Sequence, residues 1–308
     1  MEHQPPLPPS PPPAPAGVER CYRHPNVETR VHCTRCGRPI GPECMISASV
    51  GHQCPECVGQ ARQDFRRGPA DTVRRGARRA SVTQVLLVAI IGMFAIEVVA
   101  GGPASLFSGP DGRTMVDLGA SFPPLIALGQ YWRLITAMFL HFGLIHIAFN
   151  AYALWLFGRV VERDYGSVRF TLIYFIGGFV ASAASYAFGP VGAVAAGASG
   201  AVFAILGAFV AYNYRRRHVA LAAANLRTAV GLIMINLFLA FVIPGIDWRA
   251  HAGGLLAGLA AGAVADEIGP RRLRPLIQVS GFVTIALVGL ALVAVRTAQL
   301  RSEFPSLG

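Results

Sequence analysis

The chain has 308 residues, of which 53% are hydrophobic and only 14% are charged. Its mean hydropathy of +0.48 is a poor fit for a soluble globule and indicates a membrane protein with a small polar appendage. The formal net charge of +11 does not indicate nucleic-acid binding, because the basic residues lie in short runs beside apolar segments rather than on one folded face.

The first 81 residues are polar and divide into three parts. Residues 1–19 form a Pro-rich tail that we expect to be disordered, because this composition cannot build a core. Residues 20–59 hold all six cysteines, and residues 60–81 form a basic linker. The first apolar run begins only near Val82, so we expect no cleavable signal sequence and a cytosolic N-terminus.

The cysteines are spaced as in structural zinc sites. The pattern contains the pairs Cys21-x2-His24, Cys33-x2-Cys36 and Cys54-x2-Cys57, together with Cys44. Because no Glu lies nearby in a catalytic motif, we expect structural zinc here and no cofactor for catalysis. The segment is then an interaction or regulatory module, with a cytosolic protein as its candidate partner.

This segment resembles the B-box-like, cross-braced zinc fingers, in which the first and third ligand pairs share one metal and the second and fourth share another. The resemblance implies that one four-thiolate site is closed by Cys33, Cys36, Cys54 and Cys57. The other site, with Cys21, His24 and Cys44, is one ligand short, because Gly41 stands where a cysteine is expected. His52 or a water molecule is the candidate for the missing ligand.

Seven stretches are long and apolar enough to cross a bilayer as helices. They are residues 82–100, 143–162, 168–188, 199–214, 228–244, 250–266 and 276–296. Arginine runs fall on one side if every stretch spans, which predicts a cytosolic N-terminus and zinc module. The segment 101–142 is too long for a hairpin and partly apolar, so we expect it to dip into the outer leaflet.

Ser199 is the first candidate for chemistry. It lies in the sequence Gly197-Ala198-Ser199-Gly200, where a loop enters an apolar helix. Glycines at such a point let another backbone approach the hydroxyl and leave the neighbouring amides accessible. The alternative is that these small residues serve only close helix packing.

His251 is the second candidate, at the outer end of the stretch 250–266. Gly254, Gly258 and Gly262 follow it on one helical face, so this face is expected to pack closely against another small-residue helix. An ionisable side chain in such a contact is costly without a role, and His251 with Ser199 makes a candidate base and nucleophile. The alternative is a plain interfacial histidine.

A third polar group stands at the outer end of the stretch 143–162, in the sequence HFGLIHIAFN. It supplies His141, His146 and Asn150, and the last two share a helical face. Two hydrogen-bond donors so placed can stabilise an oxyanion. The alternative is that they only join neighbouring helices.

These residues give the chain a resemblance to the rhomboid proteases. The matching motifs, in the family's order, are Trp132-Arg133, His146-x3-Asn150, Gly158-x3-Glu162, Gly197-Ala198-Ser199-Gly200 and His251-x-Gly253-Gly254. The resemblance covers residues 82–268 and implies an all-α, polytopic core of six transmembrane helices. Residues 269–308 then hold a seventh transmembrane helix and a C-terminal tail.

The resemblance also implies roles for the site. Ser199 is the nucleophile and His251 its general base, without an acidic third member. His146, Asn150 and the Ser199 amide form the oxyanion hole, with His141 and Gly197 beside it. Phe203 replaces the usual tyrosine beneath the histidine and keeps the stacking face.

By the same resemblance Trp132 and Arg133 belong to the loop that dips into the membrane, and Glu162 braces that loop. The stretch 228–244 and the following loop would move to admit a substrate. The expected function is hydrolysis of a peptide bond in or next to transmembrane segments of membrane proteins in the lipid bilayer, without nucleic acid. The active site would open to the extracellular side of a multi-pass protein of the cell membrane.

Other classes of function remain as alternatives. A catalytically silent, rhomboid-like scaffold or quality-control binder would use the same fold without cleavage. A transporter or channel is less well supported, because no internal repeat is evident. No span contains a His-Glu-x-x-His or a Gly-x-Gly-Asp motif, so the other intramembrane protease classes are disfavoured.

Overall fold

The computed structural model describes residues 19–48, 51–67, 81–266 and 272–303. The chain divides into two compact units, residues 1–79 and 80–308, and each is considered by itself. Nearly all of the predicted tail and most of the predicted linker lie outside the described residues.

The N-terminal unit is small and nearly without regular structure. Its elements are β1 (Glu19–Arg20), β2 (Glu28–Thr29), the 3₁₀ turn η1 (Pro42–Cys44), β3 (Ile46–Ser47), β4 (His52–Gln53) and α1 (Pro55–Arg67). β1 pairs with β2 and β3 with β4, both antiparallel. The buried hydrophobic side chains are Ile40 and five of the cysteines, so the core is made largely of sulfur.

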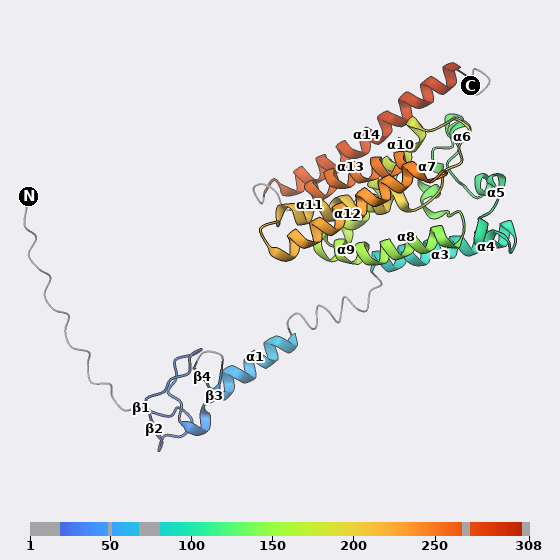
Figure 1. Ribbon diagram of the computed structural model, residues 1–308. Helices are drawn as coiled ribbons and strands as arrows, with labels where there is room; N and C mark the ends of the chain where they lie inside the picture. The colour runs from blue at the N-terminus through green and yellow to red at the C-terminus, as the bar shows by residue number, and fades with distance from the viewer. Residues whose placement is uncertain (1–18, 49–50, 68–80, 267–271, 304–308) are drawn as a thin grey trace, which may run out of the picture. The chain divides into compact units, whose positions relative to one another are not determined.

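The C-terminal unit is all helical, as predicted (Figure 1). The long helices are α3 (Val82–Gly101), α8 (Leu144–Ala153), α9 (Arg159–Tyr165), α10 (Ser167–Phe188), α11 (Ser199–Arg215), α12 (Ala220–Val242), α13 (Trp248–Ala265) and α14 (Arg274–Glu303). A π-helical segment, η3 (Leu154–Gly158), joins α8 to α9. The first long connection, residues 102–143 between α3 and α8, contains five short elements: α4 (Ser105–Ser108), α5 (Gly112–Asp117), α6 (Pro123–Ala127), α7 (Arg133–Thr136) and η2 (Ala137–Phe139).

Five of these helical segments in the described residues are long and apolar enough to cross a membrane: α3, the run Leu144–Tyr165, α10, α12 and α14. The chain is therefore a polytopic membrane protein. The two remaining predicted spans are also helices, α11 and α13. α11 has only 17 residues, and α13 begins with polar residues that include Arg249 and His251.

Two boundaries differ from the prediction by more than three residues. α12 begins at Ala220 rather than at residue 228, because the Ala-rich segment before Arg227 continues the helix. α14 continues to Glu303, seven residues beyond the expected end at 296, although its last turns are polar.

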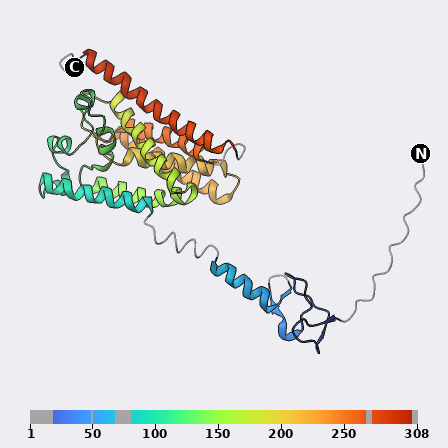
Figure 2. The same ribbon diagram turned by 180° about the vertical axis from the view of Figure 1, so that it is seen from behind.

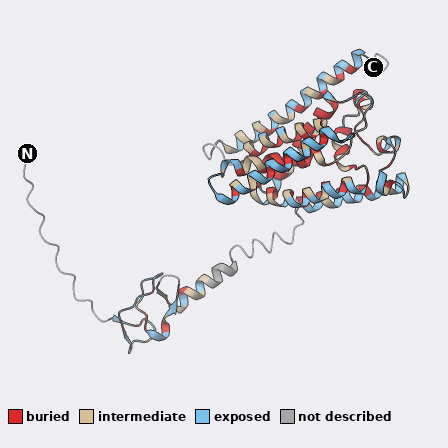
Figure 3. Ribbon diagram, in the orientation of Figure 1, coloured by how far each residue is buried: buried red, intermediate tan, exposed pale blue. Residues whose placement is uncertain are grey.

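α11 lies at the centre of the bundle. α14 runs along one side and α3 with α8 and α9 along the other, in both views (Figures 1 and 2). Most of the first three turns of α11 are buried, whereas much of α12 and α14 is exposed (Figure 3). The exposed side chains of α12 and α14 include many large apolar ones. Such exposed faces are suited to contact with lipid.

Glycines bring α11 and α13 into backbone contact. A side chain at Gly254 would strike the Gly200 carbonyl, and one at Gly258 would strike the Ala204 carbonyl. A Cβ at Gly262 would lie 2.6 Å from Ala208 Cα. The prediction that these three glycines pack on another small-residue helix is confirmed.

The first long connection is held together by the buried side chain of Arg133, which is only 5% exposed. The guanidinium donates to the carbonyls of Val116 and Ala120 and to Gln130 Oε1. The connection also reaches the segment before α11, because the Ser121 and Ala195 backbones exchange two hydrogen bonds of 2.9 Å. Arg133 thus stabilises a loop that contacts the Ser199 segment.

The expectation that Glu162 braces this loop is wrong. Its carboxylate accepts the backbone N–H groups of Val82 and Thr83 and the hydroxyls of Thr83 and Ser167. Glu162 therefore caps the N-terminus of α3, where free amides favour a negative charge. The loop lies at the other end of α3, beyond Gly101.

Candidate active site and metal clusters

Ser199 is the first residue of α11, and the backbone turns into this helix at Gly197. Gly197 has φ +141°, a conformation that favours glycine. A Cβ built on Gly197 would lie 2.9 Å from His146 Cε1 and Nε2 and 3.6 Å from Ser199 Oγ. The imidazole of His146 and the hydroxyl of Ser199 therefore face the same small space, which any side chain at position 197 would fill.

His146 is oriented by a backbone hydrogen bond. The Phe142 N–H donates to His146 Nδ1 over 3.2 Å. Because Nδ1 accepts, the neutral ring carries its proton on Nε2. That Nε2–H lies beside Gly197 and Ser199, so His146 presents a hydrogen-bond donor to the site.

His251 lies in the first turn of α13, and its ring stacks on Phe203. The ring centroids are 4.3 Å apart and the planes differ by 10°. Phe203 follows Ser199 by one helical turn, and the neighbouring Gly200 touches Gly254 of α13. These contacts bring His251 to the Ser199 end of α11.

Within the described residues, no hydrogen bond joins Ser199 to His251 in this state, and the buried His251 Nδ1 makes none. Catalytic hydrogen bonds are often long in the absence of substrate, so this geometry is compatible with a nucleophile and base.

Asn150 and His141 complete the polar group. Asn150 Nδ2 donates to the His146 carbonyl over 3.0 Å, one turn back along α8. His141 is fully buried, and its Nε2 accepts the Ala198 N–H at 3.4 Å. Asn150 thus contacts the His146 backbone one turn away. His141 fixes the backbone just before Ser199 through its bond to the Ala198 amide.

Glu97 is a buried residue next to this site that the sequence reasoning missed. It is 0% exposed in α3, and both carboxylate oxygens lie 3.1 Å from the His141 amide nitrogen. The contact fixes the backbone of His141, which in turn holds Ala198. The available signal was an acidic residue inside an apolar span, which is costly unless it has a partner.

Asp247 is a second missed residue. Its carboxylate caps α13 by accepting the N–H groups of Arg249 and Ala250, and its carbonyl accepts the His251 N–H. The other carboxylate oxygen bonds the Ser185 hydroxyl on α10. Asp247 thus fixes the turn that carries His251 to a neighbouring helix. An aspartate just before a predicted helix is a capping signal that could have indicated it.

Replacing Asp247 with alanine should lower the midpoint of thermal unfolding by about 2–4 °C, because a lost cap costs about 1 kcal/mol. Asp247→Asn should retain most of the stability, since asparagine caps equally well. Scanning calorimetry of the purified chain measures both. Equal midpoints for Asp247→Ala and the wild type would contradict this role.

The cysteine-rich unit holds two clusters of ligand atoms. In each cluster the atoms lie within 4.8 Å of one another: Cys33, Cys36, Cys54 and Cys57 in the first, and Cys21, His24 and Cys44 in the second. Tetrahedral zinc with bonds of about 2.3 Å requires sulfurs about 3.8 Å apart. The sulfurs of Cys36 and Cys54 are 3.8 Å apart, so the four-thiol cluster fits zinc.

The pKa values of the thiols in the four-thiol cluster shift in opposite directions, as expected when neighbouring thiols compete to lose their protons. Burial raises the pKa of Cys33, but the amides of Cys54, Cys36 and Arg35 outweigh it and lower the pKa to about 6. The neighbouring Cys54, with burial, raises the pKa of Cys57 to about 12. Because adjacent thiolates repel one another, removal of all four protons is favoured only with a bound cation.

The second cluster has three ligands, and Gly41 adjoins it. A Cβ on Gly41 would lie 3.3 Å from Cys21 Cβ and 3.6 Å from its sulfur. Position 41 thus faces the cluster, where a cysteine would be the fourth ligand. His52 lies in β4 and is not among the ligand atoms that converge there.

The candidate site residues from His141 to His251 lie in a segment that matches a known protein family. Residues 128–267 match the family model described as Rhomboid domain. The chain is 37% identical over 209 residues to Rhomboid protease GluP of Bacillus subtilis, an alignment that covers 66% of this chain and 39% of that protein. It is 36% identical over 162 residues to RHOMBOID-like protein 6, mitochondrial, of Arabidopsis thaliana, covering 51% and 52%.

A third relative is the Putative rhomboid protease YdcA of Bacillus subtilis. It is 32% identical over 133 residues, covering 43% of this chain and 66% of that protein. The chain thus spans about half the length of the first curated relatives it matches.

Proposed function

The chain carries a rhomboid domain, and from this premise we propose that it is an intramembrane serine protease that hydrolyses a peptide bond in or next to transmembrane segments of other membrane proteins. The observation that carries the proposal is the meeting of Ser199 Oγ and the His146 ring at Gly197, with His251 stacked on Phe203 one turn away. Two of the relatives are named as proteases, one of them putatively.

The proposed chemistry is acyl transfer through Ser199. Its hydroxyl attacks the substrate carbonyl, and His251 accepts the proton and returns it to the leaving amine. Water then hydrolyses the acyl-enzyme, again with His251 as base. The stacked Phe203 fixes the plane of the imidazole throughout.

The oxyanion that forms on the substrate needs donors at the N-terminus of α11. The Nε2–H of His146 and the Ser199 amide adjoin this point, and each such donor contributes about 3 kcal/mol in soluble enzymes. Asn150 is the third proposed donor, after it exchanges its bond to the His146 carbonyl for one to the substrate.

Access for a substrate helix is proposed through α12. This helix exposes Met234, Phe238 and Phe241, and only 17% of its apolar window is buried in the protein. It therefore has fewer packing contacts to lose than α10, of which 61% is buried. The tie between Asp247 and Ser185 would hold His251 in place while α12 moves.

The N-terminal unit and the orientation complete the proposal. Zinc bound by Cys33, Cys36, Cys54 and Cys57 would hold that unit together, and a cytosolic protein is its candidate partner. Arg215 and Arg216 stand at the end of α11 opposite Ser199. By the positive-inside rule, this supports the proposal that Ser199 is on the extracellular side of the cell membrane and the N-terminus in the cytosol.

A catalytically silent scaffold is the second candidate, favoured by the absence of a Ser199–His251 hydrogen bond among the described residues. Reconstitution with a single-span reporter in liposomes separates the two. Cleavage by the wild type and none by Ser199→Ala, measured by gel mobility, would support the protease. A Ser199→Ala variant that cleaves at the wild-type rate would refute it, and an inactive wild type would favour the scaffold.

A further inference from the structure

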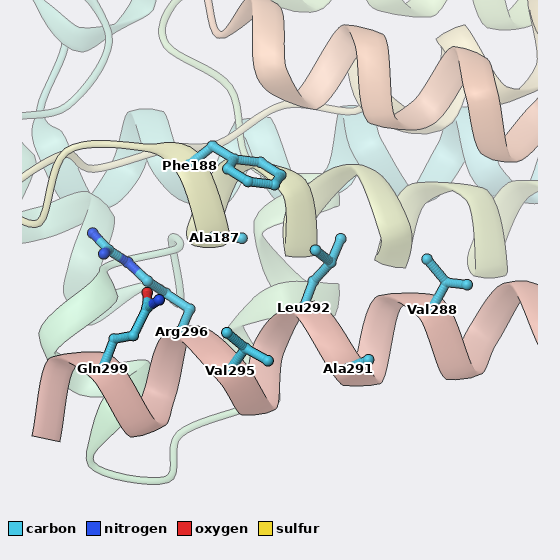
Figure 4. A pocket seen from close by; sticks show the side chains of 8 residues that line it. All are labelled: Ala187, Phe188, Val288, Ala291, Leu292, Val295, Arg296 and Gln299. Atoms are coloured by element: carbon cyan, nitrogen blue, oxygen red, sulfur yellow. The ribbon is translucent and has the colours of Figure 1, made fainter.

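An apolar groove lies between α10 and α14, and none of its lining residues belongs to the candidate active site. Its volume is about 310 Å³, and its lining includes Ala187 and Phe188 of α10 and Val288, Leu292, Val295 and Arg296 of α14. Figure 4 shows the apolar side chains in sequence along α14, with Arg296 and Gln299 side by side at one end. The groove is thus apolar over most of its length and polar at one end only.

Arg296 has more donors than partners. A guanidinium has five N–H donors, yet Arg296 makes one hydrogen bond, from NH2 to the Gly189 carbonyl at 3.4 Å. Its Nε is buried without a partner, and no acid in the described part of the chain lies within ion-pair distance of it. A half-buried cation in a membrane protein is costly unless an anion accompanies it.

The length of α10 indicates that Arg296 lies at the depth of the lipid headgroups in a bilayer. α10 has 22 residues, about 33 Å of helix, which matches a hydrocarbon core of about 30 Å. Gly189 follows the last residue of α10, so its bond to Arg296 places the guanidinium at the membrane surface. Val288 precedes Arg296 by two turns and lies about 12 Å deeper.

The apolar sides of the groove are exposed, as expected of a surface that contacts lipid. Val288 is 53% exposed and Val295 is 59% exposed. A hydrocarbon chain can cover them without any polar partner, whereas the cation at the end of the groove calls for an anion. The lining residues include no carboxylate that would pair with a headgroup ammonium.

We propose that this groove binds an anionic phospholipid, with one acyl chain along Val288, Leu292 and Val295 and its phosphate on Arg296 and Gln299. The phosphate accepts the N–H groups of Arg296 that have no partner among the described residues. This proposal is independent of catalysis by Ser199.

Native mass spectrometry of the purified full chain in detergent tests the site, with palmitoyl-oleoyl-phosphatidylglycerol as the probe. Arg296→Gln should weaken binding about fivefold, since a basic side chain near an anionic headgroup contributes about that much. Ala291→Trp, which fills the groove, should weaken binding while it leaves the charge in place. Arg301→Gln removes a cation from the same helix outside the groove and should bind as the wild type does.

Three results would overturn the site: unchanged binding by Arg296→Gln, an equal loss in Arg301→Gln, or equal binding of the corresponding phosphatidylcholine. Glycerol phosphate, which has no acyl chain, should raise the unfolding temperature less than the lipid. An equal rise would mean an anion site rather than a lipid site. A dimer that Ala291→Trp dissociates, seen by size-exclusion chromatography, would mean that a second copy of the chain occupies the groove instead.

Discussion

Replacing His251 with alanine should lower the cleavage of a single-span reporter by at least about 10³-fold, because without the base the Ser199 hydroxyl is only a weak nucleophile. The same change should abolish labelling of Ser199 by a fluorophosphonate, which requires an activated hydroxyl but no substrate helix. Labelling and cleavage therefore report on the same pair through different reagents. A loss in cleavage alone would point to substrate access rather than to the base.

His218 offers a matched control for His251. It is an exposed histidine just beyond the opposite end of α11, and His218→Ala should cleave and label as the wild type does. Circular dichroism should show unchanged helix content in both variants. Full labelling of Ser199 in folded His251→Ala would exclude the proposed pair.

Replacing Cys54 with serine should remove about one zinc ion per chain, because a four-thiolate site that loses one thiolate binds zinc much more weakly. The buried hydrophobic side chains of the N-terminal unit are Ile40 and cysteines, so loss of the metal should also unfold that unit. Elemental analysis measures the zinc, and limited proteolysis measures the unfolding. Cys33→Ser should behave in the same way.

Two further variants make this result specific. His32→Ala removes a histidine that pairs with Glu19 outside both clusters, and it should leave the zinc content unchanged. Cys21→Ser alters only the second cluster, so the zinc held by the four thiols should remain. A Cys54→Ser chain with the wild-type zinc content would disprove metal binding by the first cluster.

The helical architecture and most of the candidate site could be predicted from sequence. Ser199 and His146 were recognised because each is a polar residue at the end of an apolar helix, and Phe203 was recognised through the resemblance to the rhomboid proteases. α12 was predicted to begin eight residues too late, although a helix can carry one arginine near its end. The close packing of Gly254, Gly258 and Gly262 on another helix followed from their helical repeat, and only the structure shows that Gly254 meets Gly200.

Glu162 shows that a local sequence pattern does not reveal which distant residue a side chain contacts. Its place in a motif suggested a loop partner, but its carboxylate caps α3, about 80 residues earlier in the chain. Local signals marked Glu97 and Asp247 as unusual, but they did not indicate the partner of either residue. Each bonds a group on another element, the His141 amide in one case and the Ser185 hydroxyl in the other.

The sequence by itself determined that the chain is a helical membrane protein, that its cysteines form pairs with zinc spacing, and which residues are candidates for nucleophile and base. These features depend on hydrophobicity and on spacings of a few residues, which are local. Only the tertiary structure decided that His146 presents its Nε2–H at Gly197, that Asp247 ties the turn of His251 to α10, and that Arg296 ends an apolar groove. Each of these depends on which helices meet and at what depth, and that is set by packing between residues far apart in the chain.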